Sequence, residues 1–389
     1  MQQIYLDYNA TTPVAPSVVE AMQSFLAGHY GNPSSSHALG RAAAEAVEDA
    51  RSKISLFLGC DRDEVIFTSG GTESNNFAIK GIMLRGAQIA KTQSARPSHL
   101  VISAIEHPAV SKPAKFVEQF GCEVTVVKCD EDGVVSPNDI EAAIRPNTRL
   151  VSVMHANNEI GTIQPIRRIA EICHREGVLV HTDASQSAGK ISTIVDELGV
   201  DLLTIAGHKF YGPKGVGALF VREGIELEPL LHGAEHEQGL RAGTENTPYI
   251  VGMAQAANLV GKSLDDSYEK MSELRDLLQS RLVDSIPGLH VNGGQADRLP
   301  NTLSVSFPKV QGHDLLARVP EICCSTSSAC HSDGVSGSAT LIAMGASPER
   351  MAGKVRLSVG VYVDRRNRTR CRSPNRSVGK HGELKESYA

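Results

Sequence analysis

The sequence predicts an α/β fold: a large domain built on a mainly parallel sheet of seven strands, followed by a smaller α+β domain. Three observations lead to this prediction. Short apolar runs alternate with amphipathic helical patterns over about 200 residues. Most of the runs are continuous rather than alternating with polar residues, which is typical of strands covered on both faces. Near residue 260 the pattern changes to a long helix followed by shorter strands.

Seven runs rich in β-branched residues or leucine are predicted as the strands of the large sheet. In chain order they are Glu64–Thr68, His99–Ala104, Glu123–Val127, Leu150–Met154, Val178–Thr182, Leu202–Ala206 and Val216–Val221. Helical patterns fall between the runs. Arg41–Leu58 places Val47, Ile54 and Leu58 on one face, and Pro165–Glu176 opens with a proline suited to a first helical turn.

The domain boundaries follow from these patterns. We expect an N-terminal arm over residues 1–14 that packs with the small domain, a large domain over 15–260 and a small domain over 261–360. The small domain is predicted to open with one amphipathic helix, marked by Tyr268, Met271, Leu274, Leu278 and Leu282. Residues 361–389 hold eight Lys or Arg against three acids and lack apolar periodicity, so a disordered basic tail is expected.

The composition is that of an ordinary globular protein. The 389 residues are 41% hydrophobic and 21% charged, with a net charge of −5 and no tryptophan, which argues against nucleic acid as a partner. Neither a secretory signal nor a membrane-length apolar run is visible. Eight cysteines without a CxxC pair indicate reduced thiols and a cytoplasmic location. The spacing of Cys323, Cys324, Cys330 and His331 fits no common zinc pattern, so no metal is predicted.

Polar motifs follow five of the predicted strands. In chain order they are Ser69–Asn75, Glu106-His107-Pro108, His155–Glu159, Asp183 with Gln186, and His208-Lys209. In an open α/β sheet, ligands bind outside the carboxyl ends of the strands. The five motifs are therefore expected to meet in one crevice.

A lysine and an acid at the ends of buried strands suit pyridoxal phosphate. Lys209 can hold the aldehyde as a Schiff base, while Asp183 keeps the pyridine nitrogen protonated. Gly71 and Thr72, at a glycine turn that opens a helix, can cradle a phosphate. Plainer interpretations remain open: Lys209 as a surface lysine, Asp183 as a helix cap with Gln186 completing a capping box, and His107 as a buried structural histidine.

Together these motifs resemble one enzyme family. The matching segments are DYNATTP (7–13), GNPSS (31–35), FTSGGTESNN (67–76), EH (106–107), ANNEIG (156–161), HTDASQSAGK (181–190), GHKFYGPKG (207–215), RAGTEN (241–246) and SSACHSD (327–333). From about residue 4 to Gly360 the chain resembles the pyridoxal-phosphate-dependent cysteine desulfurases and the closely related selenocysteine lyases. The resemblance implies the type I fold of pyridoxal-phosphate-dependent transferases.

The resemblance also implies how the cofactor is held. Lys209 would form the Schiff base and later move the α-proton of the substrate. Asp183 would pair with the pyridine nitrogen, Gln186 would bond the ring hydroxyl, and His107 would stack on the ring and assist proton transfer. Asn157 would add a further cofactor contact.

The phosphate contacts implied by the resemblance come from two subunits. Thr72, the Gly71 amide and His208 would hold the phosphate within one chain. Thr244 would reach the phosphate of the partner subunit, which implies a homodimer with shared sites.

The resemblance also implies how the substrate is bound and which reaction takes place. Asn157 and Arg356 would hold the substrate carboxylate, for which the arginine offers a two-pronged match. Cys330, in a Ser- and Gly-rich segment, would attack the substrate sulfur and keep it as a persulfide for a sulfur-acceptor protein. L-cysteine would leave as L-alanine, and the sulfur would serve iron–sulfur cluster or thiolation pathways.

Two departures from the family pattern keep alternatives open. Ala206 stands where the family usually has Ser or Thr, as an apolar residue does in the lyase-like branch. After Gly360 the family continues with an arginine and a covering helix, which this sequence lacks. The alternatives are a selenocysteine lyase acting on L-selenocysteine, a catalytically impaired member that serves as a binding or relay platform, and a transaminase on the same fold.

Overall fold

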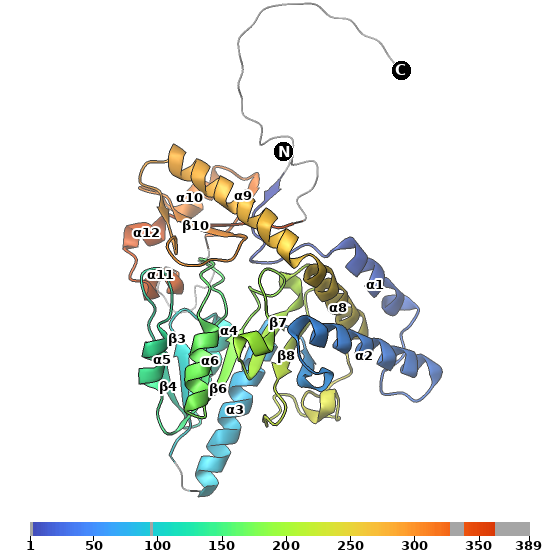
Figure 1. The fold of residues 1–389 in the computed structure, drawn as a ribbon. Coiled ribbons are helices and arrows are strands. Elements are labelled where there is room, and N and C mark those ends of the chain that lie inside the picture. The colour runs from blue at the N-terminus through green and yellow to red at the C-terminus, as the bar shows by residue number, and fades with distance from the viewer. Residues whose placement is uncertain (1–2, 94–95, 327–337, 362–389) are drawn as a thin grey trace, which may run out of the picture.

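The computed structural model describes residues 3–93, 96–326 and 338–361. The seven predicted strands form a single sheet, and each agrees with the prediction to within two residues at either end. This confirms the predicted α/β class (Figure 1). Their spatial order is β2 (Val65–Thr68), β8 (Gly217–Val221), β7 (Leu202–Ala206), β6 (Leu179–Asp183), β5 (Thr148–Ser152), β3 (His99–Ser103) and β4 (Glu123–Val127).

One strand, β8, runs against the others. It pairs antiparallel with both β7 and β2, whereas the remaining neighbours in the sheet pair parallel. The reason is the connection from β7, residues 207–216, which carries only the short 3-10 helix η2 (Gly207–Lys209). A parallel neighbour would need a crossover of about a dozen or more residues. The chain therefore turns back and keeps Lys209 at the carboxyl end of β7.

Helices cover both faces of this sheet. On one face, α3 (Gly71–Gln93) and α4 (Pro108–Glu118) bury Phe77 and Val110. Successive strand residues point to opposite faces, so Leu100 and Val101 contribute to different apolar cores. The other face is covered by α2 (Ala38–Leu58), α5 (Pro137–Ala143), α6 (Ile166–Arg175), α7 (Val195–Leu198) and α8 (Thr247–Lys262).

Helix α1 (Pro16–Ala27) packs on α8, and together with α2 it extends to one side of the molecule in Figure 1. The 3-10 helix η1 (Arg62–Glu64) directly precedes β2, and the 3-10 helix η3 (Glu237–Gly239) precedes α8.

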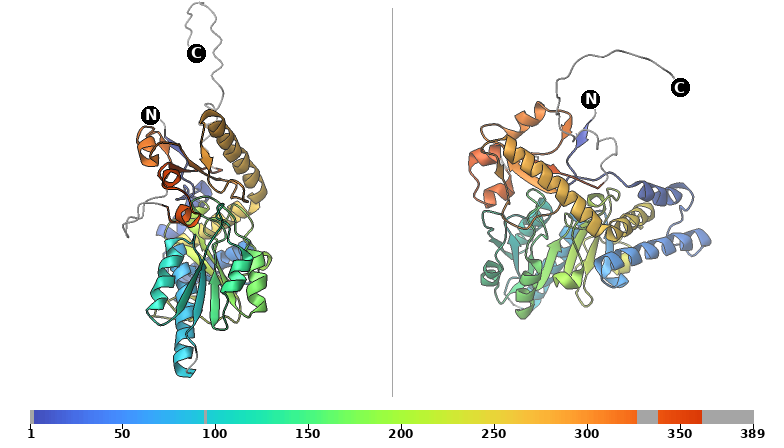
Figure 2. Two further views of the ribbon diagram at one scale, coloured as in Figure 1. Left: turned by 90° about the vertical axis from the view of Figure 1, so that its left-hand side faces the viewer. Right: turned by 45° about the horizontal axis from the view of Figure 1, so that its top comes forward.

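A second, smaller sheet lies above the carboxyl edge of the first. Its antiparallel order is β12 (Lys354–Ser358), β10 (Thr302–Ser306) and β9 (His290–Val291). The predicted long helix is α9 (Leu264–Ser285), which runs along this upper part down to α8 (Figure 2). The N-terminal strand β1 (Ile4–Tyr5) pairs parallel with β11 (Ile322–Cys323). The remaining helices are α10 (Gly312–Ala317), α11 (Ala339–Ala343) and α12 (Pro348–Ala352).

Two predicted features lie outside the described residues: Cys330 and, apart from Val361, the basic tail over 361–389. The predicted boundary after residue 260 falls in the last turn of α8, and the division into domains stays a prediction. In the described ranges, no helix combines the length and hydropathy needed to cross a membrane.

Candidate active site

Polar residues from five strand ends meet in one cavity of about 260 Å³ at the carboxyl edge of the large sheet. Its lining comprises Gly71, Thr72, Asn75, His107, Ala109, Met154, Ala156, Asn158, Asp183, Ser185, Gln186, Ala206, His208 and Lys209. Seven residues predicted from the sequence are thus brought together, from motifs that span 139 positions between Gly71 and Lys209 inclusive. The parallel strands explain this, because their carboxyl ends share one edge of the sheet.

Lys209 projects from η2 and is held by the N-terminal arm. Its Nζ donates hydrogen bonds to the carbonyl oxygens of Asn9 (2.7 Å) and Ala10 (3.0 Å). Burial lowers the pKa of Lys209 to about 8, helped by the positive charge of Arg356 and opposed by Asp183. The neutral amine, the form that attacks an aldehyde, is therefore more populated near neutral pH than it is for an ordinary lysine.

Asp183, the last residue of β6, is oriented by two donors. Its Oδ2 accepts from Asn75 Nδ2 (2.7 Å), and its Oδ1 accepts from the backbone N–H of Ser185 (2.9 Å). The second bond is cap-like, in line with the plainer interpretation, but the carboxylate also lines the cavity. Gln186 donates its Nε2 to Asn9 O (2.9 Å). Within the described chain, Gln186 Oε1 is buried and has no hydrogen-bond partner.

His107 caps the N-terminus of α4 and faces the cavity. Its Nδ1 accepts from the backbone N–H of Ala109 (3.1 Å), so in the neutral ring the proton is on Nε2. Burial lowers the pKa of His107, which favours this neutral form. The preceding residue, Glu106, is fully enclosed, and burial raises its pKa to about 8. Burial therefore favours the protonated form of Glu106.

The end of the cavity at the start of α3 is suited to an anion. Gly71 and Thr72 open this helix, whose first backbone N–H groups carry partial positive charge. A Cβ at Gly71 would lie 2.9 Å from Ser185 Oγ and 3.4 Å from Ala206 Cβ, so the backbone approaches its neighbours too closely for a side chain. His208 contacts Thr11 Oγ1 through Nδ1 (3.2 Å), and burial lowers its pKa to about 4.

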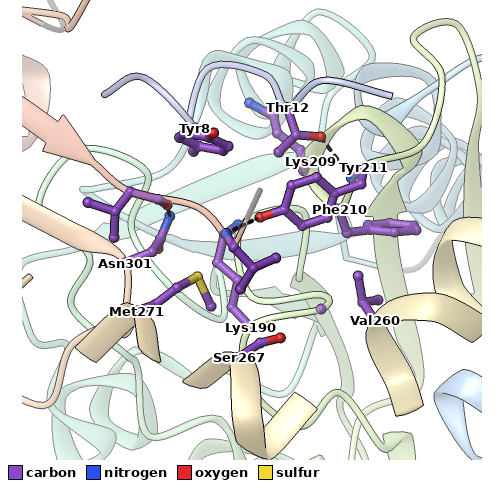
Figure 3. A pocket seen from close by; sticks show the side chains of 13 residues that line it. Tyr8, Thr12, Lys190, Lys209, Phe210, Tyr211, Val260, Ser267, Met271 and Asn301 are labelled. Atoms are coloured by element: carbon purple, nitrogen blue, oxygen red, sulfur yellow. Dashed lines mark hydrogen bonds between the residues drawn. The ribbon is translucent and has the colours of Figure 1, made fainter. Parts of the chain in front are cut away.

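A second, much smaller cavity of about 10 Å³ lies beyond Lys209 (Figure 3). Its side chains come from the N-terminal arm, from the segments after β6 and β7, from α8 and α9, and from the residues before β10 and after β12. Among them is Lys190, whose Nζ donates to Gln186 O (2.7 Å). Burial lowers the pKa of Lys190 to about 7, with contributions from the charges of Lys209 and Arg356.

Of the other predicted residues, two lie beside the cavity rather than in its lining. Asn157 is fully buried: it donates to Ile105 O (3.1 Å), and its Oδ1 accepts from the backbone N–H of Glu159 (2.8 Å). Arg356 donates to Asn158 O (2.9 Å) and to Asp7 Oδ1 (2.7 Å). In the part of the chain described, its buried Nε has no partner. The contacts predicted for both residues stay predictions.

Thr244 lies elsewhere. It is exposed and lines a separate cavity of about 150 Å³ with Glu237, Arg241 and Asn246. Cys330 is outside the described residues. Cys324 packs against the apolar core of the small sheet. No group of three potential metal ligands occurs among the residues described.

The residues present fit pyridoxal phosphate. The amine of Lys209 can bond to the cofactor's aldehyde, and the carboxylate of Asp183 can pair with its pyridine nitrogen. The start of α3 can bind its phosphate. The unpartnered, buried Gln186 Oε1 is the most specific sign, because an enclosed acceptor without a donor is costly unless a ligand supplies one. The hydroxyl of the pyridine ring is such a donor.

Three residues of the site were not assigned a role from the sequence. Asn75 is three positions after Thr72 on α3, so helical spacing could have placed it on the same face. Glu106 was noted only as part of its motif. For Lys190 no local signal exists, since its burial depends on α9 and the N-terminal arm, which are distant in sequence.

Comparisons with known proteins agree with this geometry. The family model "Aminotransferase class-V" matches residues 4–367. A cysteine desulfurase IscS of Dictyoglomus turgidum is 44% identical over 364 residues, covering 93% of this chain and 91% of the relative. One from Methanosarcina thermophila is 43% identical over 359 residues, covering 92% and 87%.

Solved structures show the same relationship. A "NifS-like protein" superimposes with a TM-score of 0.84 at 38% identity, covering 93% of this chain and 94% of the other. "SspA in complex with cysteine" gives a TM-score of 0.81 at 35% identity, covering 92% and 98%. With its lysine, acid and phosphate-binding turn converging on one cavity, the chain belongs to the pyridoxal-phosphate-dependent cysteine desulfurases of the class-V aminotransferase family.

Proposed function

We propose that this protein is a cysteine desulfurase that converts L-cysteine to L-alanine and retains the sulfur as a persulfide on Cys330. The observation that carries the proposal is that Lys209 and Asp183 line the same cavity. Gln186 also lines this cavity, and its buried Oε1 has no hydrogen-bond donor among the described residues. The desulfurase relatives support the reaction, and the related structure with bound cysteine supports the substrate. Bound pyridoxal phosphate would supply the electron sink that allows bonds at the substrate's α- and β-carbons to break.

The chain's own residues would orient the substrate and move its protons. Lys209 Nζ, with its lowered pKa, would take the α-proton, and His107 Nε2–H would donate to the reacting groups. Arg356 would hold the carboxylate through its spare Nε–H, with the neighbouring Asn157 supporting the loop beside it. Thr72, the Gly71 amide and His208 would hold the phosphate.

Sulfur transfer balances without an external oxidant. The Cys330 thiolate would attack the substrate sulfur, so that an S–S bond forms as the substrate's carbon–sulfur bond breaks. The β-carbon gains the electron pair and a proton, giving alanine, and the enzyme keeps the second sulfur. A sulfur-acceptor protein would then regenerate the thiol. The six cysteines in the described residues are free thiols, which supports the predicted reducing, cytoplasmic environment.

The test is alanine and sulfide release from L-cysteine by the wild type, Lys209→Ala and Cys330→Ala. We expect visible cofactor absorption that borohydride bleaches, lost in Lys209→Ala and retained in Cys330→Ala, and turnover only in the wild type. Turnover that survives in Cys330→Ala would contradict the persulfide route. Running the same variants with L-selenocysteine tests the lyase alternative, and retained cofactor without alanine production in the wild type would support the platform alternative.

We propose further that the enzyme is a homodimer in which Thr244 completes the partner's site. Its exposure and its separation from the 260 Å³ cavity support a role outside its own chain. Mixing Lys209→Ala with Thr244→Ala chains tests this idea. A mixed dimer holds one site that carries both substitutions and one that carries neither, so activity should return on mixing. If mixing restores nothing although mixed dimers form, Thr244 acts within its own chain.

A further inference from the structure

A buried ion pair joins the small sheet to the loop beside the cavity. The Lys354 side chain, at the start of β12, is 1% exposed and pairs with Glu159, which is 13% exposed. Lys354 Nζ also donates to Ser338 Oγ (3.0 Å), and Ser338 donates to the same Glu159 oxygen. Burying an ammonium group is costly unless it is paired and hydrogen-bonded. The proposed chemistry makes no use of this lysine.

The ion pair is one of several contacts to consecutive residues, which we call the 157–159 loop. Asn157 Nδ2 donates to Thr340 Oγ1 of α11 (3.2 Å), and Asn158 O accepts from Arg356 Nη1 (2.9 Å). Glu159 takes the bonds from Lys354 and Ser338. Asn158 lines the active-site cavity, so any displacement of this loop reshapes the cavity wall.

Lys354 and Arg356 act on this loop from the same side. They are two residues apart on β12, and side chains at such positions point to the same face of a sheet. Both side chains are almost fully buried and reach adjacent residues of the loop. Arg356 therefore donates to the backbone carbonyl of Asn158, and the position of this carbonyl depends on the neighbouring ion pair between Lys354 and Glu159.

We propose that Lys354 is a positioning residue for recognition of the substrate carboxylate. Through Glu159 it fixes the 157–159 loop, and the loop in turn fixes the guanidinium of Arg356. The inference rests on the proposed function, in which Arg356 holds that carboxylate. It predicts that loss of the ion pair weakens binding of ligands that carry a carboxylate and leaves binding of amines without one unchanged.

The experiment compares L-alanine with ethylamine, which has the same carbon skeleton without the carboxylate. Binding of each to the cofactor-loaded dimer is followed by the change in visible absorption, which requires no turnover and no Cys330. The variants are Lys354→Met/Glu159→Gln, which leaves no unpaired buried charge, and Arg356→Met. Lys53→Met, which removes an exposed pair with Asp49, is the matched control.

We expect the double variant to lower the affinity ratio of L-alanine to ethylamine about tenfold, because small displacements of positioning groups have effects of this size or larger. Arg356→Met should lower the ratio at least as much, and Lys53→Met should not change it. If Arg356→Met lowers the ratio and the double variant does not, the inference is wrong while the proposed carboxylate site stands. If Arg356→Met leaves the ratio unchanged, the carboxylate role itself fails.

Two further outcomes are decisive. Equal weakening of both ligands by the double variant would mean a purely structural ion pair and would overturn the inference. Should the double variant not fold, Lys354→Met alone carries the test, because Glu159 is less deeply buried than Lys354 and keeps the hydrogen bond from Ser338. It must then lower the ratio without affecting ethylamine for the inference to stand.

Discussion

Replacing Glu237 by alanine should strongly destabilise the protein. The carboxylate accepts from Arg51 Nη1 (2.8 Å), from Arg51 Nη2 (3.0 Å) and from the backbone N–H of Phe67 (2.8 Å). The side chains of Arg51 and Glu237 are 6% and 2% exposed. Burial alone lowers the pKa of Arg51, but the hydrogen bonds and charge of Glu237 more than reverse this, and the pKa is raised. The guanidinium thus stays charged inside the protein and depends on its partner.

The magnitude follows from what Glu237→Ala leaves behind. A guanidinium that loses its buried partner costs about 3–5 kcal/mol, and the half-exposed Glu48 that still contacts Arg51 offsets little of this. The N–H of Phe67, deprived of its acceptor, adds about 1 kcal/mol or more. The free energy of unfolding should therefore fall by about 4–6 kcal/mol, as measured by urea unfolding followed by circular dichroism.

The same arginine provides the control. Glu48 also pairs with Arg51 (3.1 Å), but its side chain is 52% exposed. Glu48→Ala should therefore cost at most about 0.5 kcal/mol. Arg51→Met combined with Glu237→Met should cost less than Glu237→Ala alone, since no buried charge remains unpaired. If Glu237→Ala and Glu48→Ala differ by less than about 1 kcal/mol, the reasoning from burial is refuted.

Three more predictions concern the cavity and its surroundings. The pKa of Lys190 is lowered from 10.5 to about 7 in the folded state, so between these values the unfolded chain binds a proton that the folded chain does not. The wild type's free energy of unfolding, measured with urea, should rise with pH across this window. Lys190→Met should stabilise the protein most below pH 7, and this gain over the wild type should vanish near pH 10.5. A gain that does not change with pH would contradict this. Gly71→Ala should weaken cofactor binding at least about tenfold because the added Cβ meets Ser185 Oγ, and a fluorescence titration should show recovery in Gly71→Ala/Ser185→Gly. Ala206→Ser should bind the cofactor about five- to tenfold tighter by adding one hydroxyl donor in the cavity, and equal affinity in the same titration would show that this hydroxyl does not reach the phosphate.

Much of the fold and of the site could be predicted from local patterns. All seven strands of the large sheet were recognised because their burial on both faces produces continuous apolar runs. Lys209, Asp183 and Gly71 were recognised because each follows such a run, and parallel strands end at a common edge. The reversed direction of β8 was not foreseen, although the short connection over residues 207–216 was visible in the sequence.

The sequence by itself determined the class of fold, the edge of the sheet at which the polar motifs meet and the residue types available there, since these depend on spacing along the chain. Only the tertiary structure decided which charges are buried and what they pair with. Arg51 and Glu237 are 186 positions apart, and Lys354 and Glu159 are 195 apart, so no local pattern could pair them. The lowered pKa of Lys209 has the same origin, because the arm, strands and helices that exclude water from its amine come from distant parts of the chain.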